Sequence, residues 1–262
     1  MKLNLVPART GIQWVKLGIR TFWRQPLALS GLFFLYITAV ALLSMLQFVG
    51  AVLALALTPA ATFGLMVATQ EAIRGQFPMP GVLVSALRAG RERLRAILQL
   101  GAMYAAAALL VTLIVRVVVP APAAAPQPGE LPPGLLLTLV LHAPLAIAFW
   151  FAPALVHWHG VQPVKSLFFS VVAVKRNFWA FAVYALAWGA VILATGFLVS
   201  MVALAIGNPA WAPVVMMPLA LMMAAMFFTS IYFTFVDCFG NPDAPAPTEA
   251  PAFSDKPDEP TP

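Results

Sequence analysis

An uncharged stretch at residues 27–69 constrains the fold of this chain more than any other feature. Its 43 residues include no Asp, Glu, Lys, Arg or His, and a single Gln, Gln47, lies near the middle. Because a helix needs roughly 20 apolar residues to cross a hydrocarbon core of ~30 Å, the stretch has the length of two membrane spans and a turn. Arg24 precedes it and Glu71 follows it, so the sequence predicts a hairpin whose ends lie on one side of a membrane.

The composition extends this prediction to the whole chain. Hydrophobic residues make up 62% of the sequence and charged residues 9%, whereas soluble domains are usually about 25% charged. The apolar runs are continuous over roughly 20 residues rather than alternating over about 10, which excludes a β-barrel and predicts an all-α polytopic protein. The first run is too long for a cleavable signal peptide and is read as an uncleaved span.

The predicted membrane domain covers residues 1–240 and repeats one plan three times. We expect six spans, arranged as three hairpins, at residues 27–47, 50–70, 96–119, 135–156, 178–205 and 212–236. A short amphipathic segment precedes each hairpin, at residues 11–25, 82–88 and 164–176. A Pro/Ala-rich linker occupies residues 120–134, and a proline-rich acidic tail, predicted to be disordered and cytoplasmic, follows at 241–262. Each return span contains a proline, and Pro59, Pro144 and Pro218 are candidate kinks.

The first amphipathic segment, residues 11–25, is predicted to lie in the headgroup region of the membrane. Ile12, Val15 and Phe22 share one face at helical spacing, together with Ile19 and Trp23. A helix with aromatic residues on one side and cations on the other is typical of membrane interfaces.

The cations predict the orientation and the partner of the membrane domain. Of the 15 Lys and Arg residues, all but Arg116 fall in the segments on one side of the predicted spans. Positive residues are retained on the cytoplasmic side, so both termini are expected in the cytoplasm. Bilayer lipid with anionic headgroups, rather than nucleic acid, is therefore the expected partner. The candidate headgroup contacts are Lys16, Arg20, Arg24, Arg88, Arg91, Arg93, Arg95, Lys175 and Arg176.

Polar residues in the apolar runs provide no recognisable catalytic or metal site. His157 and His159 invite a metal interpretation, but a site needs three or four ligands, and His142 lies about four helical turns away. Gln99 and His142 are expected to hydrogen-bond between helices, and Arg116 to extend toward the far headgroups. No carboxylate lies in the middle of a predicted span, which argues against proton-coupled transport. No hydrolase, zinc-protease or nucleotide-binding motif is present, so we predict no catalytic residue, metal or cofactor.

Several segments carry a resemblance to a known family. They are VPAR at residues 6–9 with Trp14, FWRQPLA at 22–28, AFWFAPALV at 148–156 with WHG at 158–160, FFS at 168–170, and YFTFVDCFG at 232–240. With them, nearly all of residues 6–240 resembles a family of six-span inner-membrane proteins of beta-proteobacteria. More loosely, the three-unit plan is similar to the membrane domains that accompany glycerophosphodiester phosphodiesterases, although no phosphodiesterase domain is present here. The resemblance implies an integral membrane protein and brings no activity with it.

Three functions are compatible with this sequence. The first, which the repeated aromatic and basic segments favour, is a non-catalytic membrane component that binds lipid or a partner protein at the cytoplasmic leaflet. The second is a small-molecule transporter or channel with a cavity among the proline-containing spans, lined by Gln99, His142 and Thr58. The third is an intramembrane enzyme, which lacks a converging set of polar groups. The sequence leaves open whether the chain forms a homo-oligomer.

Overall fold

The computed structural model describes residues 3–119, 132–208 and 210–240. The predicted tail at 241–262 and most of the linker at 120–134 therefore lie outside the described residues. All the regular structure of the described part is helical. The helices are α1 (Thr10–Arg24), α2 (Pro26–Ser44), α3 (Gln47–Ile73), the 3-10 helix η1 (Pro80–Leu87), α4 (Arg91–Val118), α5 (Leu135–Phe149), α6 (Ala152–His159), α7 (Pro163–Arg176), α8 (Phe178–Ala205) and α9 (Trp211–Phe239).

Six helical segments of the described chain are long and apolar enough to cross a membrane. They are α2, α3, α4, α5 together with α6, α8, and α9, which confirms the predicted all-α class with six spans. The bounds differ most at the third span, which begins at Arg91 rather than at residue 96. Helices form here because backbone N–H and C=O groups in lipid must bond within their own segment.

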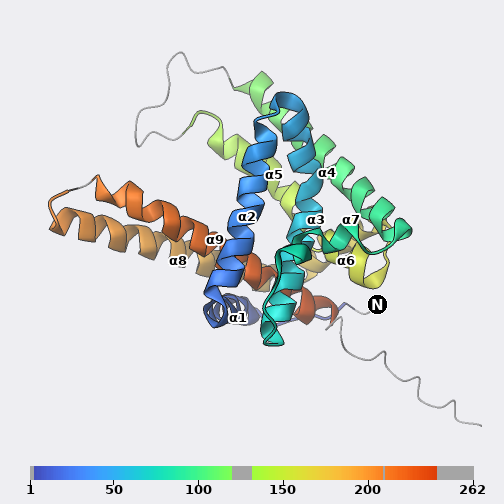
Figure 1. Ribbon diagram of the computed structural model, residues 1–262, viewed down its shortest axis with the longest axis horizontal. Helices are drawn as coiled ribbons and strands as arrows, with labels where there is room; N and C mark the ends of the chain where they lie inside the picture. The colour runs from blue at the N-terminus through green and yellow to red at the C-terminus, as the bar shows by residue number, and fades with distance from the viewer. Residues whose placement is uncertain (1–2, 120–131, 209, 241–262) are drawn as a thin grey trace, which may run out of the picture.

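The spans follow one another as packed pairs. α2 packs along α3, α4 along α5, and α8 along α9, and a short helix (α1, η1 or α7) precedes each pair. The first two pairs are joined by extensive contact between α3 and α4. In Figure 1 the α8–α9 pair extends to the left, away from the rising α2–α3 pair, so the tips of the hairpins diverge.

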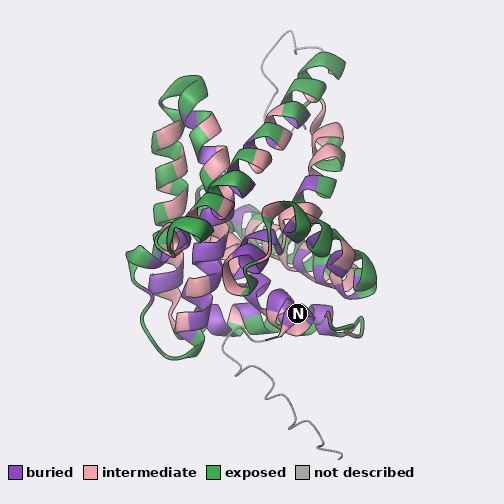
Figure 2. Ribbon diagram, turned by 90° about the vertical axis from the view of Figure 1, so that its right-hand side faces the viewer, coloured by how far each residue is buried: buried purple, intermediate pink, exposed green. Residues whose placement is uncertain are grey.

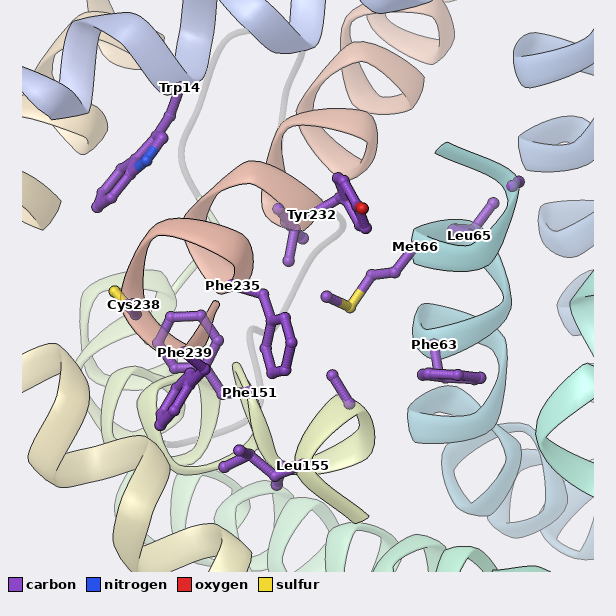
Figure 3. Close-up of a cluster of buried hydrophobic side chains, with 14 of the residues drawn as sticks. Trp14, Phe63, Leu65, Met66, Phe151, Leu155, Tyr232, Phe235, Cys238 and Phe239 are labelled. Carbon is purple, nitrogen blue, oxygen red and sulfur yellow. The ribbon is translucent and has the colours of Figure 1, made fainter. Parts of the chain in front are cut away.

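The buried residues gather at the opposite end from the tips, where the hairpins begin and end (Figure 2). Phe151, Phe235 and Phe239 form the centre of this cluster, with ring centroids 5.2–6.1 Å apart (Figure 3). Large apolar side chains at the tips, such as Phe197 on α8 and Val117 on α4, are exposed. Lipid tails solvate such side chains as well as a protein core does, so the tips need no packing partner.

Helix α1 packs on the protein through a face that overlaps only in part with the predicted apolar face, since Val15 and Phe22 are common to both. Its fully buried side chains are Trp14 and Phe22, whereas Ile12 and Trp23 remain exposed. A Cβ atom at Gly11 would overlap the backbone of α8, and one at Gly18 would overlap α9, so glycines set this close approach. The apolar pattern of the sequence did not include these glycines, and it therefore identified only part of the buried face.

The two ends of the described chain are held together by hydrogen bonds. The Asn4 N–H donates to the Cys238 carbonyl at 2.8 Å, and the Trp14 indole N–H donates to the Asp237 carboxylate at 2.7 Å. Between α7 and α8, the buried Asn177 donates its side-chain amide to the Asn4 carbonyl at 3.2 Å. The N-terminal segment, the α7–α8 junction and the end of α9 therefore form one packed unit.

The fourth span is broken between α5 and α6, after Phe149. Pro153 in the first turn of α6 explains the break, because its ring excludes the carbonyl four residues earlier, that of Phe149. The hydroxyl of Ser170 on α7 occupies the gap: it accepts from the Phe151 N–H at 3.1 Å and donates to the Ile147 carbonyl at 2.7 Å. These two backbone groups would bond each other in a continuous helix, so the hydroxyl is inserted into the helical ladder.

The three candidate kink prolines lie elsewhere. Pro59, Pro144 and Pro218 are each inside a helix that runs through them without interruption, in α3, α5 and α9 respectively. The break in the fourth span falls at Pro153 and is stabilised by a side chain from another helix, and the kinks at Pro59, Pro144 and Pro218 stay predictions.

Candidate anion-binding groove at the foot of α4

All nine predicted headgroup contacts are exposed and lie in the segments that begin or end the hairpins. Those on α1 occupy its outer side, away from α8 and α9. Arg88 follows η1, and Lys175 and Arg176 end α7. Three others, Arg91, Arg93 and Arg95, are brought together by the first turns of α4. The predicted outer cation, Arg116, is exposed close to the other end of α4.

The three arginines line a groove of about 540 Å³ between α4 and the α6–α7 connection. Arg91, Arg95 and Gln99 are spaced four residues apart, so they form one row along α4. The opposite wall includes Gly160 and Gln162, which connect α6 with α7. The groove thus gathers three predicted headgroup contacts and one of the two predicted intramembrane polar residues.

The second wall of the groove depends on the backbone conformation between α6 and α7. Gly160 ends α6 with φ of 64°, in the left-handed region that favours glycine, and the Val161 N–H donates to the Leu155 carbonyl at 3.2 Å. Pro163 then starts α7, a position where its missing N–H has no helical partner to lose. The chain therefore turns sharply beside the first turn of α4.

The electrostatics of the groove favour an anion. Its ionisable residues are three arginines and Glu92, which leaves a net charge of +2. Both α4 and α7 begin at the groove without a side-chain cap, so their first N–H groups and helix dipoles add positive potential.

Arg93 is held by a bond across the groove. Its guanidinium donates to the backbone carbonyl of His157 on α6, and the His157 ring packs on Phe63 of α3 with centroids 4.1 Å apart. In contrast, no hydrogen bond or ion pair engages Arg91 or Arg95 within the described part of the chain. Two of the three guanidinium groups are thus available to a ligand.

The other polar residues considered in the sequence do not converge on this groove. His142 hydrogen-bonds through Nδ1 to the Thr138 carbonyl at 2.9 Å, and the Thr58 hydroxyl donates to the Ala54 carbonyl at 2.9 Å, each within its own helix. The transporter hypothesis placed both residues beside Gln99 in one cavity. Of the three, Gln99 alone lines this groove, and the transporter hypothesis stays a prediction.

Besides the Arg93–His157 bond, several bonds between helices are made by residues that sequence reasoning missed. The Trp150 indole N–H donates to the Thr234 hydroxyl at 3.1 Å, and the Tyr184 and Ser230 hydroxyls lie 2.6 Å apart. The available signal was the presence of hydroxyl and indole groups in otherwise apolar spans, where such groups seek partners on neighbouring helices.

The two histidines near the groove pack on aromatic rings of different helices. The His157 ring lies against Phe63 on α3, and the His159 ring lies 5.7 Å from Phe235 on α9. Within the described ranges, no group of three or more His, Cys, Asp or Glu residues is placed to hold a metal ion.

Comparison with known proteins identifies the family. No protein-family model and no solved structure matches the chain. A protein of Burkholderia thailandensis named "Probable inner membrane protein" is 37% identical over 271 residues, which cover 98% of this chain and 100% of that protein. The looser likeness to membrane domains beside phosphodiesterases is tested by none of these comparisons and stays a prediction. With six apolar helices and full-length similarity to this relative, the chain is an integral inner-membrane protein and belongs to the same family as the Burkholderia protein.

Proposed function

We propose that this protein is a non-catalytic component of the inner membrane that binds anionic phospholipid headgroups at the cytoplasmic leaflet. The observation that carries the proposal is the groove at the foot of α4, where three arginines and two uncapped helix N-termini surround a space open to an anion. Guanidinium groups bind phosphate oxygens through paired hydrogen bonds, which suits them to this ligand.

The distribution of charge supports the same proposal. The exposed cations of α1, of the first turns of α4 and of α7, together with Arg88 after η1, lie in the segments that begin or end the hairpins. In contrast, Arg116 lies near the tip of α4. Each cation near an anionic membrane surface contributes about 1 kcal/mol of attraction. The positive-inside rule then assigns this end of the protein, with both termini, to the cytoplasm.

Neutralisation of the arginines tests the proposal. We expect the combined variant Arg88→Gln, Arg91→Gln, Arg93→Gln and Arg95→Gln to purify with a smaller share of anionic lipid than the unaltered protein. The matched control is Arg116→Gln, which removes a cation from the far end of α4 and should leave the lipid share unchanged. Lipid mass spectrometry of the purified proteins measures the effect, and an unchanged anionic share in the combined variant contradicts the proposal.

A further inference from the structure

A second hollow adjoins the arginine groove along the same row of α4. It measures about 520 Å³ and shares Arg91, Arg95 and Gln99 with the first. Its remaining lining is apolar and comprises Leu94, Leu98 and Ala102. All six lining residues lie on α4, so this apolar compartment is an open depression along one face of the helix, next to the polar compartment formed by the first groove.

The depth of α4 in a bilayer matches this division. Its 28 residues extend about 42 Å at about 1.5 Å per residue, roughly 12 Å more than a hydrocarbon core of about 30 Å. With the other end of α4 at the far boundary, where Arg116 reaches the opposite headgroups, the excess covers about the first eight residues. Arg91 and Arg95 then lie at headgroup depth, Gln99 lies at the boundary, and Ala102 lies among acyl chains.

We propose that a single anionic phospholipid occupies both hollows. Its phosphodiester contacts Arg91 and Arg95 at the uncapped start of α4, and one acyl chain lies along Leu98 and Ala102. Gln99 hydrogen-bonds the ester region between them. This inference rests on the proposed function and deepens it by naming a lipid with a phosphodiester and an acyl chain, bound in one defined site.

The two compartments favour a lipid over a soluble anion. A free phosphate would use the guanidinium groups alone, whereas the apolar side chains directly beside them on α4 offer a surface along which a hydrocarbon chain can lie. Ala102 is exposed and small, so it leaves room for that chain at a position where a larger side chain would fill the hollow.

The first test blocks the apolar compartment and leaves every cation in place. We expect native mass spectrometry of the full chain to show one tightly bound phosphatidylglycerol per protein, and we expect Ala102→Trp to abolish it. Ala106→Trp is the control, because Ala106 is exposed one turn farther along α4 and outside both hollows. Both changes lie on the exposed side of α4, and matching thermal unfolding would show that each variant is folded.

The second test removes the charges. Arg91→Gln with Arg95→Gln should weaken binding of phosphatidylglycerol roughly 30-fold, since two cations each contribute about a factor of five. Glycerophosphoglycerol, the same headgroup without acyl chains, should compete poorly with the lipid. Equal competition by this soluble headgroup would overturn the inference in favour of a free anion.

The outcomes distinguish this inference from the proposed function. If Ala102→Trp retains the bound lipid while the four-arginine variant loses anionic lipid, the two-compartment site is wrong and the proposed function stands. If the four-arginine variant also retains its anionic lipid, both fail.

Discussion

Ser170→Ala tests whether a side chain from α7 stabilises the broken fourth span. Ser170 is fully buried, and its hydroxyl joins the Phe151 N–H and the Ile147 carbonyl. An unpaired buried backbone group costs about 1–3 kcal/mol, and the carbonyl keeps only a long bond from the Trp150 N–H at 3.4 Å. Because Pro153 prevents a continuous helix at this point, we expect a loss of about 2–3 kcal/mol in the free energy of unfolding.

The matched control is Ser166→Ala, one turn earlier on the same face of α7. Ser166 is equally buried, but its hydroxyl donates only to the Pro163 carbonyl of its own helix, at 2.7 Å. Such local bonds add little to stability, so the control should lose less than about 1 kcal/mol.

Two measurements check the prediction. The thermal unfolding temperature in detergent should fall by about 4–12 °C for Ser170→Ala, at about 2–4 °C per kcal/mol for a chain of this size. Hydrogen exchange should accelerate at the Phe151 amide in Ser170→Ala and stay unchanged in the control. Equal melting temperatures for the two variants, or a protected Phe151 amide without the hydroxyl, would refute the reasoning.

Two further predictions concern helix packing and orientation. Gly101→Ala should destabilise the protein by about 1–3 kcal/mol in detergent unfolding, because its Cβ would overlap the Ala56 carbonyl of α3, whereas Gly196→Ala faces open space and should be neutral or stabilising. Equal effects of the two changes would argue against close α3–α4 packing. Because the single native cysteine is buried, cysteines introduced at Met45 and Glu92 report orientation by labelling in cells: position 45 should react with periplasmic reagents and position 92 should be shielded from them. The reverse labelling pattern would show that the protein has the opposite orientation in the membrane.

The spans were predictable because hydropathy over about 20 residues depends on composition and not on contacts. The stretch at 27–69 thus led directly to α2 and α3, and the arginines of 91–95 led to one wall of the groove. The other wall was not predictable, because Gly160 and Pro163 mark a turn without saying which helix it adjoins.

The remaining differences arise from contacts between segments distant in sequence. The buried face of α1 depends on Gly11 and Gly18 meeting α8 and α9, and periodicity within α1 carries no information about those partners. Asn177 is equally inconspicuous in the sequence, because its role comes from its proximity to the N-terminal segment. Small and polar residues make the decisive contacts here, and apolar patterns do not register them.

The position of the groove follows from how the hairpins are held together. In lipid, apolar side chains gain little by leaving the hydrocarbon, so hydrogen bonds and close backbone packing must provide the cohesion. In this protein both concentrate where the hairpins begin and end: the Trp14–Asp237 bond, the Ser170 insertion and the Arg93–His157 bond all belong to that end. A groove with one wall on α4 and the other on the α6–α7 turn is therefore framed by the most constrained part of the fold. Arg91 and Arg95 both extend from the α4 wall, whose backbone is already fixed. An anion that binds there therefore needs to order only their side chains.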